Sequence, residues 1–491
     1  MGRIADETIR GAKWGLIQKC TMQPVQFLYG IVLARLITPE EFGILGLTAI
    51  FFAVANTLKE AGFGSALIRK QDRTEADCST MFWFNWGMSC LMGLILFLLA
   101  PWFASFYQQP ELLWLTRISA LMMCISCTGG VHWVLYSARR DFKTPAIIGM
   151  ISTLVGIPIC LTLAYLGWGI WAIVTQNVVS SLLSLAILWC VSPWKPRLLW
   201  SNTSFKSLFG FGSKLALSGL LHTFYQEART FIIGKFYSPA DLGHYSRGSH
   251  MASMVPNTID GMVMSVTYPI LATLQGDLNR LGLVYRKYIK VLTLPIAWGI
   301  FTLIALARPL VEFLYGSQWL PCVIYVQLVA LACSGTHICN INLNLLQVLG
   351  RSDLFLRLEV IKKSISIAML IYAATISVEA ICWATVIYTQ IAIFINTYYT
   401  GKLIGFTWWL QQKDYLPYFL YAALSALPGY FLAQTALPDS VILAVGGLFS
   451  GVLYLFLLTL RKDVALAEYL GNLSRRCSTG CLKGWYLYLQ H

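Results

Sequence analysis

The sequence predicts an all-α polytopic membrane protein with fourteen transmembrane helices, arranged as two six-helix lobes in parallel repeat plus two extra C-terminal helices. Three observations lead to this fold class. Hydrophobic residues make up 57% of the chain and charged residues 12%, and the mean hydropathy is +0.64, unlike a soluble domain. Apolar stretches of about twenty residues, long enough to cross a bilayer, recur along the chain. One sequence motif also occurs twice.

Polar or charged residues bound each apolar stretch and so set the limits of the expected spans. In chain order the spans are 14–36, 45–67, 81–103, 113–135, 147–166, 170–189, 208–233, 245–266, 291–314, 323–346, 356–376, 380–399, 416–437 and 441–460. The first span is longer than a signal-peptide core and lacks a small-residue cleavage site. We therefore expect it to be an uncleaved membrane anchor.

Lysine and arginine are concentrated in alternate loops between the expected spans. These loops and the two terminal segments hold most of the 36 cationic residues, whereas the opposite loops hold almost none. By the positive-inside rule, an even number of spans then places both termini in the cytoplasm. The net charge of +14 follows from this topology, so we expect no nucleic-acid partner.

The duplicated motif defines the expected domain organisation. Residues 31–43 (IVLARLITPEEFG) and 231–243 (FIIGKFYSPADLG) carry the same residue types at nearly every position, two hundred residues apart. Six spans per copy is an even number, so both copies enter the membrane in the same direction. The expected divisions are an N-lobe at 1–200 (spans one to six), a C-lobe at 201–405 (spans seven to twelve), the last two spans at 406–462, and a cytoplasmic tail at 463–491.

The motif itself predicts the start of a helix. Thr38 and Glu41 have the spacing of a capping box, and Pro39 between them suits the first helical position. Ser238 and Asp241 repeat this pattern. The duplicated residues therefore inform the architecture and not the chemistry.

Polar residues inside two equivalent spans lie at helical spacing. Lys19, Gln23 and Gln26 share one face of the first span, and a longer series follows one face of the seventh: Lys214, Ser218, His222, Tyr225 and Arg229. Because an unpaired polar group in hydrocarbon is costly, such stripes normally face a cavity or a partner. With the arginines expected near the outer ends of spans four and eight, the substrate-binding candidates are Lys19, Gln23, Gln26, Arg117, Lys214, His222, Tyr225, Arg229 and Arg247.

Cations at both ends of a cavity would attract a substrate that carries a diphosphate or acidic sugars, which arginine can bind in bidentate fashion. A second interpretation stays open. Lys19 and Lys214 would extend to the membrane interface, and Arg229 and Arg247 would pair with Glu227.

Acidic residues in the spans are candidates for binding a coupling proton or cation. Glu60 and Asp260 recur two hundred residues apart, and Glu227 lies in span seven. Glu60 and Asp260 are expected near the cytoplasmic interface, and Lys59 adjoins Glu60. A structural role is therefore the favoured interpretation for this pair.

Two further residue clusters do not indicate a catalytic or binding site. Glu359 with Lys362 and Lys363 indicates a charge cluster at the inner edge of span eleven. Cys477 and Cys481 lack a matching His or Cys pair, so we expect no metal site and no cofactor.

Seven motifs, in order along nearly the entire chain, resemble a known family. They are TPEEFG (38–43), LKEAGFGSALIRK (58–70), STMFWFNWG (79–87), RRDFK (139–143), LGHYSRG (242–248), YPILATLQGD (268–277) and YGSQW (315–319). This pattern is similar to the polysaccharide-transport branch of the multidrug, oligosaccharidyl-lipid and polysaccharide exporter superfamily, in particular to colanic-acid-exporter-like Wzx flippases. Of the binding candidates, only Arg247 falls within a family motif.

The resemblance implies two six-helix lobes around a central cavity. It implies export of undecaprenyl-diphosphate-linked oligosaccharide across the bacterial cytoplasmic (inner) membrane by alternating access, without enzymatic activity. The implied partners are the lipid-linked oligosaccharide, membrane lipids, and the polysaccharide polymerase and glycosyltransferases of the same pathway.

Two other classes of protein stay open. A multidrug or cation antiporter of the same superfamily shares the architecture but needs acids deep in its cavity, whereas the stripe here is basic and amide-rich. A polytopic glycan polymerase or glycosyltransferase needs a large external loop, and the expected external loops have only about five to ten residues.

Overall fold

The computed structural model describes residues 2–60, 63–70, 72–463 and 465–467, and over these residues the regular secondary structure is entirely helical. The chain divides into two compact units, residues 1–243 and 244–491. The seventh expected span, which we assign by sequence to the C-lobe, packs against helices of the first unit. The expected lobe boundary at 200/201 stays a prediction.

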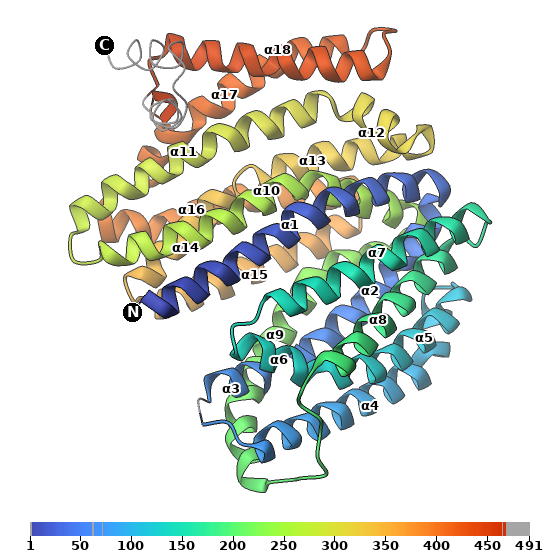
Figure 1. Ribbon diagram of the computed structural model, residues 1–491. Coiled ribbons are helices and arrows are strands. Elements are labelled where there is room, and N and C mark those ends of the chain that lie inside the picture. Colours follow the sequence, from blue (N-terminus) through green and yellow to red (C-terminus); the bar gives the residue numbers. More distant parts are fainter. Residues whose placement is uncertain (1, 61–62, 71, 464, 468–491) are drawn as a thin grey trace. The chain divides into compact units, whose positions relative to one another are not determined.

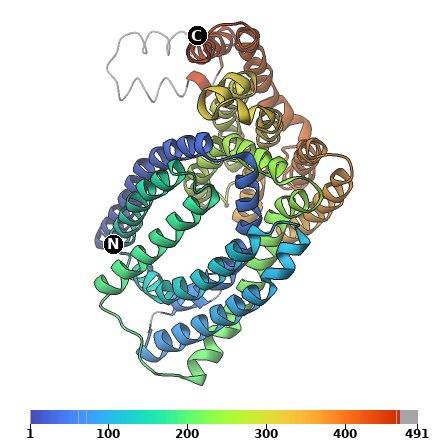
Figure 2. The same cartoon turned by 90° about the vertical axis from the view of Figure 1, so that its right-hand side faces the viewer.

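The first unit runs from α1 to α9 and includes the first turn of α10 (Figure 1). Two antiparallel hairpins, α4 with α5 and α7 with α8, lie side by side in Figures 1 and 2. The elements are α1 (Gly2–Leu36), α2 (Pro39–Glu60), α3 (Phe63–Arg69), α4 (Glu75–Phe106), α5 (Glu111–Ser126), η1 (Cys127–Gly129), α6 (Gly130–Ala138), α7 (Lys143–Tyr165), α8 (Ile170–Val191) and α9 (Asn202–Phe236).

The second unit continues α10 and ends with an antiparallel pair, α17 and α18. Its elements are α10 (Pro239–Thr273), α11 (Leu278–Ala305), α12 (Ala307–Tyr315), η2 (Ser317–Cys322), α13 (Val323–Cys333), α14 (Thr336–Val348), α15 (Ser352–Ala374), α16 (Val378–Ile404), α17 (Trp408–Leu432) and α18 (Asp439–Leu460).

In the described residues helix occupies most of each expected span, but the helix limits differ from the span limits in several places. Within the described residues, 8 helices are long and apolar enough to cross a membrane, so the count of fourteen stays a prediction. Around the expected span 291–314, α11 begins earlier, at Leu278, and ends at Ala305, and α12 follows as a separate short helix. Hydropathy missed this start because the first turns of α11 are rich in cations that a helix end outside the membrane core tolerates.

The duplicated motif forms the two expected helix starts. Glu41 Oε2 accepts hydrogen bonds of 3.0 Å from both the amide and the hydroxyl of Thr38. Asp241 Oδ2 accepts the same pair from Ser238, at 3.2 and 2.7 Å. The first copy does more, because Glu41 Oε1 also accepts the Ile170 amide at the start of α8, 3.2 Å away. One carboxylate thus caps two helices.

The glycines that end the duplicated motif permit a backbone contact. A Cβ added to Gly43 would lie 1.7 Å from the carbonyl oxygen of Pro239, and one added to Gly243 would lie 1.8 Å from that of Pro39. The start of α2 and the first turn of α10, both in the first unit, therefore touch without side chains between them.

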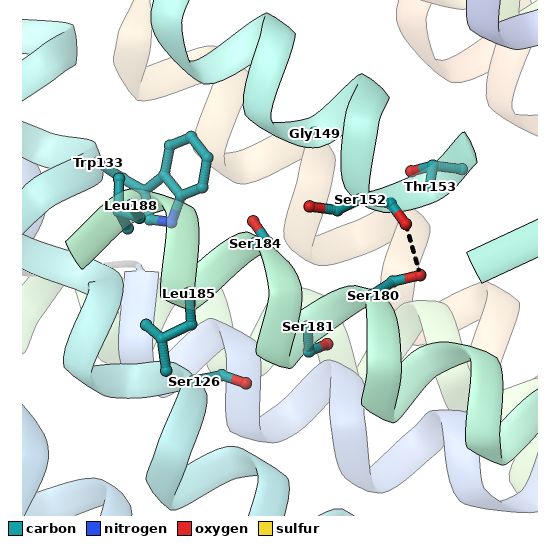
Figure 3. Close-up of a pocket in the computed structure, with 10 residues that line it drawn as sticks. All are labelled: Ser126, Trp133, Gly149, Ser152, Thr153, Ser180, Ser181, Ser184, Leu185 and Leu188. Atoms are coloured by element: carbon teal, nitrogen blue, oxygen red, sulfur yellow. Dashed lines mark hydrogen bonds between the residues drawn. The ribbon is translucent and has the colours of Figure 1, made fainter. Parts of the chain in front are cut away.

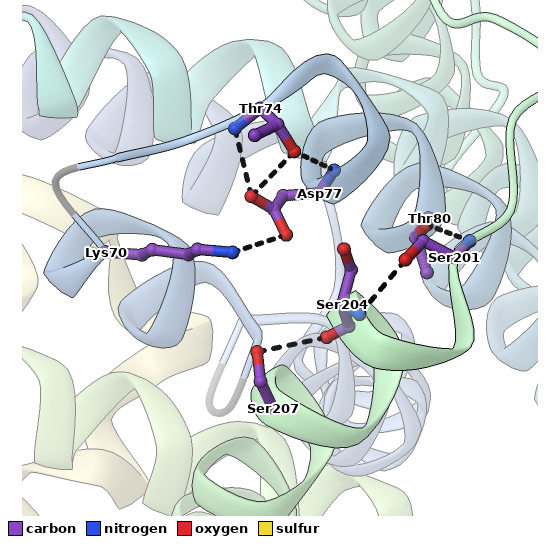
Figure 4. A network of polar contacts seen from close by, with 7 residues as sticks. All are labelled: Lys70, Thr74, Asp77, Thr80, Ser201, Ser204 and Ser207. Carbon is purple, nitrogen blue, oxygen red and sulfur yellow. Dashed lines mark hydrogen bonds and ion pairs between the residues drawn. The ribbon is translucent and has the colours of Figure 1, made fainter.

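A polar network holds the connection between α8 and α9 (Figure 4). Asp77 is fully buried and accepts hydrogen bonds from Lys70 Nζ at 2.7 Å and from the amide and hydroxyl of Thr74 at 2.9 Å. The next turn of α4 binds the connection, because Thr80 Oγ1 accepts the Ser201 amide at 3.0 Å.

Residues of the STMFWFNWG motif make further hydrogen bonds to the connection between α8 and α9. Ser79 Oγ accepts the Arg197 amide at 3.3 Å, and the Trp83 indole donates to the Arg197 carbonyl at 2.8 Å. The motif therefore holds the segment that leads from the first copy of the repeat into the second.

The second unit has a polar centre of its own. The Asn342 side chain accepts hydrogen bonds from Tyr285 at 2.7 Å and from Thr400 at 2.6 Å. On α11, next to Tyr285, Arg286 binds both carboxylate oxygens of Asp414 on α17, at 2.6 and 2.7 Å. These contacts join α11, α14, α16 and α17.

The charge cluster expected in α15 forms. Glu359 pairs with Lys362 at 2.5 Å and with Lys363 at 3.9 Å. Lys362 is only 5% exposed, and its position at the inner edge of the membrane stays a prediction. Its ammonium can be buried because Glu359 neutralises it one turn away.

Substitution at the backbone contact tests the packing of the duplicated motif. Alanine normally stabilises a helix by about 1 kcal/mol over glycine. In Gly43→Ala and Gly243→Ala the new methyl group would overlap a carbonyl, and overpacking costs about 1 to 3 kcal/mol. We expect both variants to lower the midpoint of thermal unfolding in detergent.

Gly210→Ala is the matched control, because a Cβ there meets nothing within 4 Å. It should leave the unfolding midpoint unchanged or raise it. Equal behaviour of all three variants would refute the backbone contact.

Candidate functional site

One face of α9 packs within the first unit and another does not. Thr223 bonds to Thr57 of α2 at 2.6 Å, and Gly234 leaves room for Leu47. His222 and Gln226 are exposed on α9, and their side chains lie 3.4 Å apart. The packing between α9 and α2 therefore does not use the polar stripe that was predicted from the sequence.

The same division holds for α1. The Tyr29 hydroxyl lies 3.1 Å from both Gln176 Oε1 and Cys160 Sγ, which fastens α1 to α7 and α8. Gln23 and Gln26 are exposed. Polar side chains exposed at membrane depth are costly against hydrocarbon, so both stripes fit a polar space better than a lipid-facing surface.

Two further members of the α9 stripe, Tyr225 and Arg229, are half-buried and follow His222 toward the C-terminal end of the helix. They bring a hydroxyl and a guanidinium onto about two turns of one helix face. They offer hydrogen bonds and a cation to an anionic, hydroxyl-rich ligand. Glu227 is also half-buried, but it lies four residues after Thr223, on the face that packs against α2.

Arg117 has a different environment from the stripe. Its guanidinium stacks on the rings of Phe97 and Trp114, 4.8 and 5.2 Å from their centroids. Those aromatic side chains are 37% and 56% exposed, and Arg117 Nε is buried without a hydrogen-bond partner. This aromatic setting on α4 and α5 is typical of a membrane interface, which favours an anchoring role over substrate binding.

Arg247 lies in the first turns of α10 among the family motifs. It is half-buried and interacts electrostatically with Tyr315 and Cys322. His244 packs against the buried Trp319 with ring centroids 5.6 Å apart. The LGHYSRG and YGSQW motifs thus pack together around Arg247.

Four candidates cannot be placed further. The side chains of Lys19, Lys214, Glu60 and Asp260 lie outside the described part of the structure. Their roles in binding or coupling stay predictions. Among the described residues, no group of three His, Cys, Asp or Glu side chains is placed to hold a metal ion.

Sequence reasoning missed one polar feature, a pocket lined by serines of α5, α7 and α8. Ser180, Ser181 and Ser184 lie at i, i+1 and i+4 in the second half of span six, and this spacing was the available signal.

Residues 32–324 match the profile of a family described as "Polysaccharide biosynthesis protein". This match covers more than half of the chain. The chain belongs to this family. The resemblance inferred from the seven sequence motifs is thereby confirmed.

Relatives and a solved structure agree with this family. The succinoglycan biosynthesis transport protein ExoT of Rhizobium meliloti (strain 1021) is 26% identical over 486 residues, which is 96% of each chain. The lipopolysaccharide biosynthesis protein WzxC of Escherichia coli (strain K12) is 20% identical over 365 residues, 73% of each. The lipid II flippase MurJ, in an inward closed conformation, matches with a TM-score of 0.69 at 14% identity, covering 92% of this chain and 98% of MurJ.

This member of the polysaccharide biosynthesis family is therefore a multi-pass membrane protein. Of the similar proteins, ExoT is named as a transport protein and MurJ as a flippase. The fold of the chain is that of MurJ.

Removing the charge of Arg229 in the α9 stripe, and of Arg247 in the LGHYSRG motif, tests whether these arginines bind the substrate. Arg229→Gln and Arg247→Gln should each lower glycan transport about tenfold at equal protein abundance, because a hydrogen bond to a charged group contributes about 1.5 to 3 kcal/mol. The lysine variants should retain part of the activity, since they keep the charge and lose the bidentate geometry.

Arg280→Gln is the control, because Arg280 is exposed in the first turn of α11. It should transport normally. Normal transport by both test variants, together with normal abundance, would show that these arginines are structural.

Proposed function

We propose that the chain moves undecaprenyl-diphosphate-linked oligosaccharide repeat units from the inner to the outer leaflet of the bacterial cytoplasmic membrane by alternating access, for the synthesis of a surface polysaccharide. The observation that carries this proposal is the exposure of polar side chains on α1 and α9, at Gln23, Gln26, His222 and Gln226. These residues differ from the ones that fasten the two helices within the first unit. Membership in the polysaccharide biosynthesis family supplies the class of cargo.

The chemistry of the stripes suits the head group of such a lipid. Glutamine, histidine and tyrosine side chains both donate and accept hydrogen bonds, as sugar hydroxyls require. Arg229, with Lys19 and Lys214 on the same stripes, would attract the diphosphate. The same cations would repel a cationic drug, which argues against the antiporter alternative.

The direction of transport and the coupling follow from further expectations. Both termini are proposed to lie in the cytoplasm, as the cationic loops predict. Glu227, half-buried in α9, is the acid proposed to respond to a coupling proton or cation, whereas Glu60 and Asp260 are proposed to be structural. The polysaccharide polymerase and glycosyltransferases are the proposed partners.

Reconstitution tests this function without knowledge of the glycan. Lipid-linked oligosaccharide is extracted from cells that lack the gene, where the proposal predicts accumulation, and is placed in liposomes with the purified full chain. A membrane-impermeant glycosidase should then reach nearly all of the oligosaccharide, rather than the outer-leaflet fraction only.

The same liposomes loaded with ethidium test the antiporter. Ethidium should not move against a proton or sodium gradient. Efflux of ethidium with an unchanged accessible fraction of oligosaccharide would replace the proposed function with that of a multidrug antiporter.

A further inference from the structure

The first unit contains a pocket of about 260 Å³ between the α5–η1–α6 segment, α7 and α8 (Figure 3). Six of its ten lining residues carry a hydroxyl group, and none carries a charge. The indole of Trp133 and two leucines form the rest of its wall, together with Gly149. No residue of the candidate site described above lines this pocket.

One hydroxyl of the pocket lacks a partner. Ser152 is 3% exposed, and its Oγ makes no hydrogen bond. Its backbone carbonyl is already occupied, because it accepts the Ser180 hydroxyl at 3.0 Å. Figure 3 shows the Ser152 hydroxyl on α7 and the Ser184 hydroxyl on α8 on either side of the space between these helices. A buried polar group of this kind normally has a hydrogen-bond partner, and a hydrogen-bonding group in the pocket would supply one to Ser152.

The backbone is shaped to leave this space open. The helices α7 and α8 approach each other closely at Gly156, because a Cβ added to Gly156 would lie only 2.1 Å from Ser180 Oγ. Two turns earlier on α7, a Cβ at Gly149 would meet only Gln18 Nε2, at 3.5 Å. The helices thus pack closely at Gly156 and leave an open pocket beside Gly149.

The lining selects the chemistry of a ligand. Without a charged side chain, the pocket cannot offset the desolvation of a phosphate, a carboxylate or a cation. Hydroxyl groups both donate and accept, so they match a neutral ligand that carries several hydroxyls of its own. A flat indole beside them offers apolar contact to the C–H face of a ring.

Size limits the ligand further. Pockets for drug-sized ligands measure roughly 300 to 1,000 Å³, so about 260 Å³ suits one small ring and not an oligosaccharide. Water alone is the competing occupant, since one water takes about 30 Å³ of liquid volume. The aromatic wall and the grouping of hydroxyls on facing helices favour the ring.

We propose that this pocket is a sugar subsite that holds one neutral pyranose ring of the glycan, with Ser152 and Ser184 as its central hydrogen-bonding residues. The inference rests on the proposed function, because only a glycan carrier would meet such a ligand. It assigns the neutral sugar and the diphosphate to different parts of the first unit: hydroxyls between α7 and α8 for the sugar, and the cationic stripe of α9 for the phosphates.

Binding of free sugars to the purified full chain in lipid nanodiscs tests the subsite directly. The probes are the methyl β-pyranosides of glucose, galactose and N-acetylglucosamine, with methyl β-glucuronide as the charged comparison, measured by saturation-transfer NMR. At least one neutral probe should bind the wild type, and the glucuronide should not. Ser152→Ala should weaken that binding about tenfold, because the sugar hydroxyl it serves loses its partner.

Two further variants separate the subsite from a change in folding. Ser184→Leu should abolish binding by filling the pocket. Ser253→Ala should bind normally, because Ser253 of α10 donates its hydroxyl to the carbonyl of Ser249 on its own helix. If no neutral probe binds the wild type, or if Ser152→Ala and Ser184→Leu bind like the wild type, the pocket holds water only and the subsite is refuted.

Liposome transport by the same proteins distinguishes the two proposals. Wild-type transport of lipid-linked oligosaccharide without pyranoside binding would refute the subsite and leave the proposed function standing. Absence of wild-type transport would refute the proposed function, whatever the pyranosides do.

Discussion

The start of α2 and the first turn of α10 meet backbone to backbone, and the organisation of the first unit depends on this contact. Gly43 and Gly243 make it, since each glycine faces the carbonyl of the proline in the other copy of the motif. Glu41, two residues before Gly43, caps both α2 and α8. The same region of α2 receives α9 through Leu47 and Gly234. One duplicated segment thereby sets the position of four helix segments.

This packing explains why the polar stripe remains available. Because α9 uses the face with Thr223 and Gly234 to contact α2, His222 and Gln226 are left exposed. On α1, Tyr29 makes the contact to α7 and α8 and leaves Gln23 and Gln26 exposed. The residues that pack these helices and the residues proposed to bind the ligand thus occupy different faces of the same helices.

Sequence reasoning predicted the features that depend on local spacing. The capping boxes at Thr38 and Ser238 follow from residues three apart, and the family follows from seven short motifs. The start of α11 at Leu278 did not follow, because hydropathy marks the membrane core and not the helix that extends beyond it. The burial of Lys362 depends on how α15 packs, which no pattern within one helix determines.

The candidate site was predicted only in part, because local spacing groups only some of its residues. Helical spacing grouped the stripe residues, whereas the sugar pocket is assembled from segments that sequence distance separates. Each serine alone is ordinary in a membrane helix, where small residues serve packing. Arg117 shows the converse, since its position in the sequence suggested a cavity mouth and its aromatic neighbours indicate an interface.

The central claim is that the chain carries lipid-linked oligosaccharide across the membrane. The most direct measurement is the distribution of that lipid between the two leaflets in spheroplasts of a strain that lacks the gene. The account predicts accumulation in the inner leaflet, protected from an external glycosidase until the spheroplasts are opened, and release of this block by the wild-type gene. Lipid-linked oligosaccharide that stays accessible from outside, at an unchanged total amount, would contradict it.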